Sequence, residues 1–120
     1  MKNSSVKPLY SIKRNDQRRL LLSKVEIADT FFSRMKGLLQ RDGFTESDGI
    51  LITPCNYVHT IGMRFSIDLV FLNKQNRVIG LKRNMRKNRF AGIMQAKHTL
   101  ELPAGKLESL DIGMGDRLSW

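Results

Sequence analysis

The sequence has one cysteine, three prolines and few aromatic residues, which make up 8% of its 120 residues. A single cysteine cannot form an internal disulfide, so a disulfide-stapled fold is excluded and a reducing compartment fits. No apolar run approaches the roughly 18 residues of a membrane-spanning helix, and the longest, such as IDLVFL, have the length of a strand. The segment from Lys2 to Lys24 lacks the apolar core of a secretory signal. We therefore expect no transmembrane segment and a cytoplasmic location.

Acidic residues are also scarce, since 11 Asp and Glu oppose 21 Lys and Arg, for a formal net charge of +10. With 41% hydrophobic and 27% charged residues, the composition is typical of one soluble globular domain. We expect that domain to span residues 1–120, with an N-terminal hairpin extension over 1–27 and a core over 28–120. A positive charge of this size favours anionic partners, such as a small anion, an acidic protein, a membrane surface or nucleic acid.

The densest charge lies between positions 82 and 89, where five of eight residues are basic and none is acidic. This basic patch comprises Lys82, Arg83, Arg86, Lys87 and Arg89. Such a patch either meets an anionic partner or forms a solvated strand edge, where charge discourages pairing with other chains. Only Phe90 follows it as an aromatic residue, and no nucleic-acid-binding motif accompanies it. The pattern favours the solvated edge, and nucleic acid is the weaker alternative.

The hydrophobic pattern predicts about six or seven short strands and two helices. A stripe of apolar residues at helical spacing predicts an amphipathic helix over about 29–41, and a second, short helix is expected at about 106–110. Strand-like runs bounded by turn residues occur at 9–13, 19–28, 49–54, 66–73, 77–83, 97–105 and before Trp120. Strands dominate without βαβ alternation, so we expect a mainly β or α+β fold with a compact, mostly antiparallel, barrel-like sheet.

The segment PCNYVHTIGMRFSID, residues 54–68, holds the candidate catalytic side chains. Cys55 and His59 could form an activated thiol, with Asp68 orienting the imidazole. The alternative is that Cys55 is a small buried hydrophobe and that His59 bonds a backbone carbonyl, which the pattern favours. One Cys and one His leave a zinc ion two ligands short, so we predict no metal and no cofactor. Whether the protein is an enzyme stays open.

Asp68 is the most informative of these residues because it stands inside an apolar run. A buried carboxylate is costly unless it is paired or accepts several hydrogen bonds. Its candidate partners are Arg34, Arg64 and the N–H groups of the loop before it. The favoured account is a buried Asp–Arg pair that fixes a loop without doing chemistry, and the functional alternative is that Asp68 tunes His59 within a pocket. Two arginines near one acid leave a surplus positive charge, so the leading functional hypothesis is a binding pocket for an anionic small molecule or peptide group, lined by Arg34, His59, Arg64 and Asp68. Alternation along LELPAG predicts that Glu101 faces outward, and an inward-facing Glu101 would be a further partner for Arg34.

Several blocks of the chain together resemble the domain-of-unknown-function 192 family. They are ADTFFSRMKGLLQR, DGILITPCNYVHTIGMRFSIDLVFLN, RVIG, HTLELPAG and GMGDRLSW, in order over about residues 28–120. The characteristic family positions are Thr30, Arg34, Gly37, Leu38, Pro54, Cys55, His59, Thr60, Met63, Arg64, Asp68, Phe71, Leu100, Glu101, Leu102, Gly105, Gly115 and Asp116. The chain departs from the pattern at Gly62, Ser66 and Asn73, and the first two changes loosen the loop that would build a pocket.

The resemblance implies a small β-rich domain and brings no established reaction, cofactor or substrate. Some family members are similar to proteins encoded near pilus-assembly and secretion machinery, which implies a context and no mechanism. The leading hypothesis is therefore a non-catalytic binding or accessory domain with the polar pocket. The alternatives are a basic interaction module for nucleic acid, a membrane surface or an acidic partner, and a Cys/His-dependent enzyme.

Overall fold

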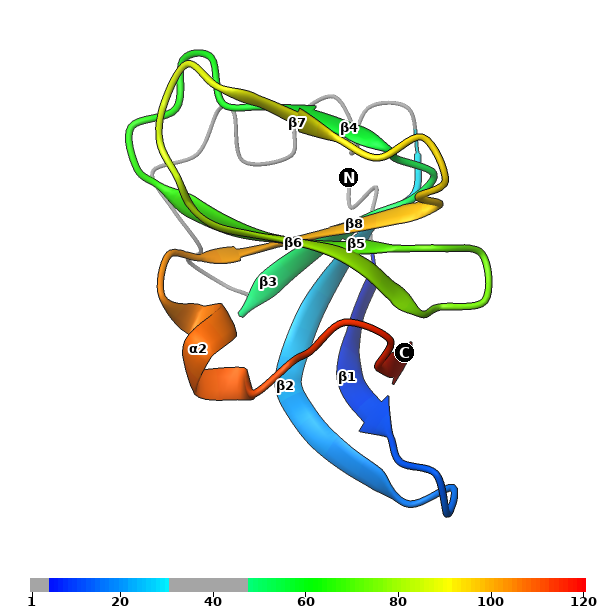
Figure 1. Ribbon diagram of the computed structural model, residues 1–120. Coiled ribbons are helices and arrows are strands. Elements are labelled where there is room, and N and C mark those ends of the chain that lie inside the picture. The colour runs from blue at the N-terminus through cyan, green and yellow to red at the C-terminus, as the bar shows by residue number, and fades with distance from the viewer. Residues whose placement is uncertain (1–4, 31–47) are drawn as a thin grey trace.

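The computed structural model describes residues 5–30 and 48–120, where it contains nine strands and one short helix (Figure 1). Almost all of the helix expected at about 29–41, including Arg34, lies outside these ranges. The elements are β1 (Ser5–Ile12), β2 (Arg18–Ala28), β3 (Gly49–Ile52), β4 (Tyr57–His59), β5 (Ile67–Leu72), β6 (Val78–Met85), β7 (Phe90–Gly92), β8 (His98–Pro103), α2 (Lys106–Leu110) and β9 (Arg117–Ser119). The described part of the chain contains no helix with the length and apolar character that a membrane crossing requires.

Seven of the strands form one curled sheet in the order β6-β5-β8-β3-β2-β1-β9. All neighbours are antiparallel except β2 and β3, which pair parallel. The two edges approach each other at one isolated bridge, Arg77 to Arg117, where the Val78 N–H also donates to the Asp116 carbonyl at 2.8 Å. The predicted fold is confirmed as mostly β and mainly antiparallel, with the short helix at 106–110; the curl is barrel-like without closing along its length.

The remaining two strands, β4 and β7, pair with each other as a separate antiparallel ribbon. This ribbon was absent from the predicted strands because each of its strands is only three residues long. In Figure 1 it lies above the β5, β6 and β8 layer, whereas α2 lies below that layer. The seven-stranded sheet is therefore covered on both sides.

Two hydrophobic cores follow from this arrangement. The inner core fills the curl, where all seven strands and α2 contribute, for example Leu9, Leu51, Val70, Leu107 and Leu118. The ribbon-side core lies between the sheet and the β4–β7 ribbon, and it contains Ala28, Ile50, Ile52, Val58, Met63, Ile67, Leu69, Phe71 and Met85. Burial of this apolar area is the main source of the domain's stability.

Strand β5 belongs to both cores, and all six of its residues are buried. Its even positions, Asp68, Val70 and Leu72, face the inner core, and Leu69 and Phe71 face the ribbon. On the neighbouring strand β8, Leu100 and Leu102 face the inner core, so Glu101 between them faces the ribbon side of the sheet, where it is buried, and the prediction that it faces outward into solvent is wrong. Glu101 is only 4% exposed, because the surface beyond β8 is covered instead of open to water.

Candidate functional site

Asp68 is buried, as its apolar setting predicts, with 1% of its surface exposed. Its carboxylate accepts three backbone hydrogen bonds: Oδ1 from the Asn84 N–H at 2.8 Å, and Oδ2 from the Gly105 and Leu107 N–H groups at 2.9 and 3.0 Å. None of these donors belongs to the loop that precedes Asp68. The carboxylate is thus held by segments that lie 16, 37 and 39 residues further along the chain.

These bonds give Asp68 two structural tasks. Two residues of β6, Arg83 and Asn84, oppose Asp68 alone in the β5–β6 pairing, which makes a β-bulge with Asn84 at a positive φ of 51°. The same carboxylate caps the first turn of α2, whose N-cap, Gly105, has no side chain to do so. Asp68 therefore fastens the bulge and the helix to the middle of the sheet.

His59 lies on the other side of the sheet, in the β4–β7 ribbon. Its backbone pairs with Phe90, and its ring centroid is 6.2 Å from the Phe90 ring. Its Nδ1 is buried and has no hydrogen-bond partner among the described residues. Because α2 and the ribbon cover opposite faces of the sheet, the structure does not bring Asp68 and His59 together.

Cys55 precedes the ribbon and is partly exposed. Its thiol donates to the Tyr57 carbonyl with a sulfur–oxygen distance of 3.3 Å, and its side chain packs against the ribbon-side core. This is the arrangement of a small, partly buried hydrophobe. Residues 5–30 and 48–120 contain no group of three or more His, Cys, Asp or Glu side chains that could hold a metal ion.

The outer face of the ribbon carries aromatic side chains. Val58 and Ala91 pair across the ribbon and pack inward, so strand alternation turns the flanking pairs, Tyr57 with Gly92 and His59 with Phe90, outward. Tyr57 and Phe90 are 54% and 58% exposed, and their rings stack at 6.0 Å with an interplanar angle of 29°. Sequence reasoning missed this pair because its two residues are 33 positions apart and meet only through the ribbon.

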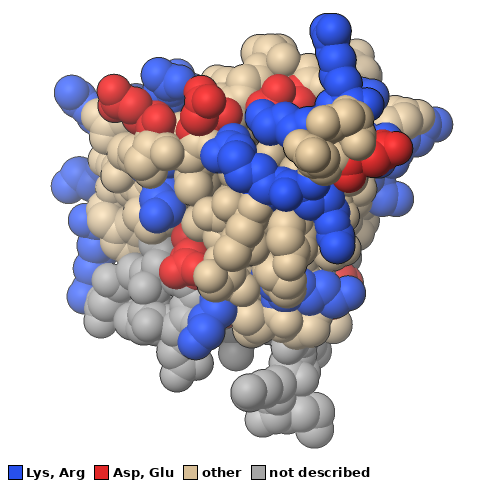
Figure 2. All heavy atoms as spheres, turned by 90° about the horizontal axis from the view of Figure 1, so that it is seen from below, with Lys and Arg blue, Asp and Glu red and all other residues tan. Residues whose placement is uncertain are grey.

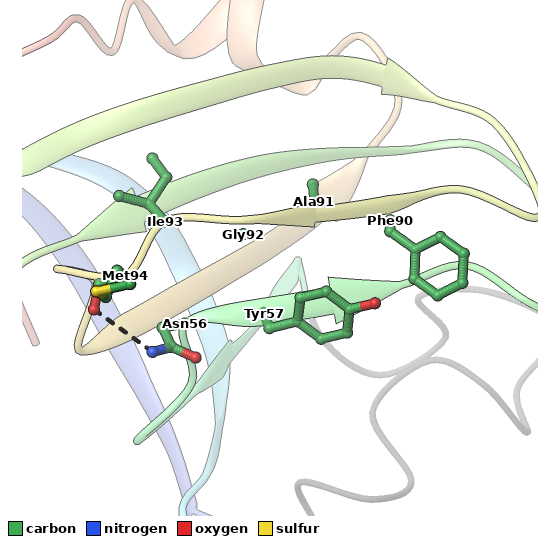
Figure 3. Close-up of a pocket in the computed structure, with 7 residues that line it drawn as sticks. All are labelled: Asn56, Tyr57, Phe90, Ala91, Gly92, Ile93 and Met94. Carbon is green, nitrogen blue, oxygen red and sulfur yellow. Dashed lines mark hydrogen bonds between the residues drawn. The ribbon is translucent and has the colours of Figure 1, made fainter.

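Beside these rings the ribbon surface is hollowed, with a volume of about 440 Å³. Figure 3 shows Tyr57 beside Phe90 from the two strands, with Asn56 and Met94 at the opposite end of the hollow. The Asn56 side-chain amide donates to the Met94 carbonyl at 3.4 Å. The hollow is mainly apolar, and it is completed by Ala91, Gly92 and Ile93.

The basic loop, residues 86–89, joins β6 to β7 at one end of this ribbon. All of its residues are exposed, and Thr60 holds it in place. The fully buried Thr60 hydroxyl donates to the Arg86 carbonyl at 2.5 Å and accepts from the Arg89 N–H at 2.9 Å. The Thr60 backbone also donates to the Arg89 carbonyl and accepts from the Asn88 N–H. Four hydrogen bonds from one residue therefore fix the conformation of the loop.

Thr60 also lies between two of the predicted binding residues, since His59 precedes it and the exposed Arg64 is in the following loop. We use the name cationic corner for Arg86, Lys87 and Arg89 of this loop together with His59 and Arg64, which lie close to Thr60 in the chain. The corner joins part of the predicted pocket to part of the predicted basic patch. Lys82 and Arg83 are also exposed, on β6 before the loop. Arg34 lies outside the described residues, so its pairing with Asp68 or Glu101 stays a prediction.

Positive charge is not confined to the corner. Figure 2 shows Lys and Arg side chains spread over the opposite side of the molecule, seen from below Figure 1, with smaller groups of Asp and Glu among them. The β1–β2 turn contributes Lys13 and Arg14, which are both exposed. What distinguishes the corner is therefore its fixed loop and its aromatic neighbours.

The second histidine, His98, lies at the start of β8 on the inner-core side. Its Nδ1 is 2.7 Å from the Thr53 hydroxyl, and its ring meets Trp120 edge-on at 4.9 Å. Burial lowers the pKa of His98 below its ordinary value of 6.5, and the charge of Lys97 lowers it further. A neutral imidazole in this position supports the packing of the C-terminal strand.

The family model of DUF192, described as "Uncharacterized ACR", matches residues 11–120. A UPF0127 protein of Pyrococcus furiosus is 34% identical over 104 residues, which cover 81% of this chain and 86% of the relative. A UPF0127 protein of Thermococcus sibiricus is 31% identical over 102 residues, which cover 81% of this chain and 66% of the relative. The chain thus spans just under two thirds of the length of the Thermococcus protein.

Two solved structures share the fold. A protein of unknown function from Novosphingobium aromaticivorans aligns with a TM-score of 0.78 at 20% identity, covering 96% of this chain and 85% of that one. A protein from Sinorhizobium meliloti 1021, described as a candidate transcription regulator, aligns with a TM-score of 0.80 at 19% identity, covering 99% and 96%. At these identities the likeness shows the fold alone.

Proposed function

This chain belongs to the DUF192 family, and we propose that it is a non-catalytic binding domain that recognises an anionic ligand at the cationic corner. The observation that carries the proposal is the Thr60 anchor, which fixes the backbone of a loop carrying three exposed cations. A fixed loop loses little conformational entropy on binding, so its charges act at low cost.

The chemistry of the corner suits phosphate or carboxylate groups. Arginine presents a planar fork of N–H donors that matches either group with two parallel hydrogen bonds, and lysine adds a compact charge. Of the residues predicted to bind, His59 and Arg64 belong to the corner, whereas the Asp68 carboxylate is already used by three backbone donors. The proposal therefore keeps the anionic ligand and moves its site to the end of the ribbon.

An enzyme based on Cys55 and His59 has less support. The Cys55 thiol donates to a neighbouring carbonyl, and the acid that would orient His59 faces the opposite core. Binding requires only the charge and shape that the corner supplies. We therefore favour recognition over turnover.

The test compares two double variants that carry the same change in net charge. Arg86→Glu with Arg89→Glu reverses two charges at the corner, and Lys13→Glu with Arg14→Glu reverses two exposed charges at the β1–β2 turn. Binding of inorganic polyphosphate is measured by titration calorimetry at low salt. We expect at least a tenfold loss of affinity for the corner variant and less than a threefold loss for the turn variant. Equal losses would show that polyphosphate responds to net charge alone, and the proposal would fall.

A further inference from the structure

We propose that the anionic ligand is single-stranded nucleic acid, whose phosphates contact the cationic corner and whose bases stack on Tyr57 and Phe90. This inference rests on the proposed function and adds the class of ligand. It differs from the expectation at the sequence level, where Phe90 alone followed the basic patch. The fold supplies the second ring from β4.

The exposure of the two rings is the first argument. Tyr57 and Phe90 leave more than half of their surface in water, and Met94 beside the hollow is 86% exposed. The folded domain gains little from apolar side chains in this position, because Val58 and Ala91 on the inner face already supply the ribbon's contact with the core. Neighbouring exposed apolar side chains rimmed by polar residues are a feature of interaction sites.

The geometry of the rings is the second argument. Two aromatic side chains on adjacent antiparallel strands lie side by side in Figure 3, with ring centroids 6.0 Å apart and ring planes 29° from parallel, so their exposed faces can together form one platform. Every base has a π-face, so such a platform accepts successive unpaired bases with little regard to sequence. Bases of a duplex are already stacked on each other and cannot use it.

The order of charges and rings is the third argument. Arg89 is followed directly by Phe90, and Tyr57 lies against Gly92 one step further along the ribbon. The cations of the basic loop therefore precede Phe90 in the chain, and the rings and the hollow follow along the ribbon, where Figure 3 shows them. A single nucleic-acid strand has the matching order across its width, from phosphate through sugar to base. Its phosphates can therefore meet the cations while its bases reach the rings. At the far end Asn56 offers an amide that can bond a base edge.

An acidic peptide or an anionic membrane would also be attracted by the charge of +10. Neither requires a pair of stacked rings beside the cations. The rings are the feature that separates nucleic acid from other anions, and the experiment is built on them.

The experiment measures binding of a fluorescein-labelled 12-nucleotide oligothymidylate by fluorescence anisotropy over a salt series. Tyr57→Leu and Phe90→Leu keep an apolar side chain and remove the π-face, and circular dichroism checks that each variant is folded. We expect each to weaken binding at least fivefold, Tyr57→Phe to weaken it less than twofold, and Leu20→Ala, at an exposed position on β2, to leave it unchanged. Arg86→Glu with Arg89→Glu should weaken binding at least tenfold and make the salt dependence shallower by about 1.4 in slope, for two lost contacts.

The controls separate this inference from the proposed function. If the leucine variants bind the oligonucleotide like the parent protein, or a duplex of the same length binds as tightly as the single strand, the nucleic-acid inference is overturned. Loss of polyphosphate binding in the corner variant would still support the anionic site in that case. If polyglutamate or phosphatidylglycerol vesicles bind more tightly than the oligonucleotide and depend on the rings, the ligand class is wrong. If the corner variant and the turn variant lost polyphosphate affinity equally, both the anionic site and the nucleic-acid inference would be refuted.

Discussion

At the scale of single residues, Asp68 carries the clearest assignment. A carboxylate on a fully buried strand is tolerated because three backbone N–H groups replace the water it loses. Those donors would themselves be unsatisfied without it, one at the bulge of β6 and two at the start of α2. Asp68 therefore serves folding, and its removal should be felt in stability before it is felt in binding.

We expect Asp68→Asn to lower the free energy of unfolding by roughly 2–3 kcal/mol, since the amide replaces a charged acceptor and turns a donor toward buried donors. Urea unfolding checks the value. Asp48→Asn is the matched control, because Asp48 is exposed and accepts one bond, from the Lys24 N–H at 3.1 Å, so its change should stay within about 1 kcal/mol. If Asp68→Asn left the stability unchanged and weakened oligonucleotide binding, the structural role of Asp68 would be refuted and a role in binding supported.

His98 makes stability depend on pH in a defined direction. Its pKa in the folded protein is lowered below 6.5, so the unfolded chain takes up a proton more readily as the pH falls. The contribution of the neutral imidazole is fully present above about pH 6.5 and is lost as the pH falls through the lowered pKa. We expect His98→Gln to flatten the fall in unfolding free energy between pH 7 and pH 5, measured by urea titration at each pH.

An NMR titration of the His98 ring tests the cause directly. Lys97→Gln removes the nearby positive charge and should raise the pKa of His98 part of the way toward its ordinary value. A pKa at or above 6.5 in the parent protein would contradict the whole argument.

The sequence could predict the burial of Asp68 and not its partners. Burial follows from the apolar neighbours along one strand, which are adjacent in the chain. The partners are backbone groups of Asn84, Gly105 and Leu107, and a backbone N–H has no residue type by which to recognise it. The role of Thr60, which the resemblance gave only as a characteristic family position, was not predicted for the same reason, because Thr60 acts on the main chain of a loop that begins 26 residues later.

At the scale of elements, the β4–β7 ribbon depends on close contact between its two strands. A Cβ at Gly92 would come within 2.8 Å of the Asn56 carbonyl oxygen and 3.1 Å of Tyr57 Cδ2. The first of these atoms is backbone and cannot move without loosening the ribbon. The glycine thus allows Tyr57 to lie flat across the strand and beside Phe90.

We expect Gly92→Ala to destabilise the protein by about 1–3 kcal/mol through overpacking and to weaken oligonucleotide binding, since it displaces Tyr57. Thermal or urea unfolding gives the first value, and ring-to-ring NOEs between Tyr57 and Phe90 report the displacement. Gly113→Ala is the control, because its added Cβ would meet nothing nearer than Asp116 Oδ2 at 4.0 Å. Intact NOEs and parent-like binding in Gly92→Ala would refute the role given to this glycine.

Seven strands and the short helix could be predicted from the chain, because each is long enough to show alternation or is bounded by turn residues. The ribbon could not, since three residues show less than two periods of alternation. Its location over the sheet depends on packing between distant segments, such as Ile93 against Gly80. The cationic corner was therefore visible in the sequence only as separate pieces.

At the scale of the whole molecule, β5 couples the two cores. Leu69 faces the ribbon-side core and Val70 the inner core, and both are fully buried. Because one backbone holds both sets of side chains, a loss of packing on one face of β5 also destabilises the packing on the other face. The domain should therefore unfold as one unit.

We expect Leu69→Ala to lower the free energy of unfolding by about 3 kcal/mol. Trp120, the chain's one tryptophan, packs against the inner core and reports from the opposite side of the sheet. Its fluorescence transition should shift together with the circular dichroism signal. Leu20→Ala, at a position that is 51% exposed, should change the free energy of unfolding obtained from either signal by no more than about 1 kcal/mol. A Trp120 transition that stays in place would mean that the ribbon side unfolds on its own.

The way Thr60 holds the basic loop leaves room for change. Its four bonds to the loop reach main-chain atoms, so they do not depend on the side chains of Arg86 and Arg89, whereas the positive φ of 60° at Asn88 restricts that position to few residue types. Mutation of Arg86 or Arg89 can change which ligands the surface attracts without changing the hydrogen bonds that hold the loop. Members of one lineage could in this way inherit a common scaffold and diverge in what they recognise.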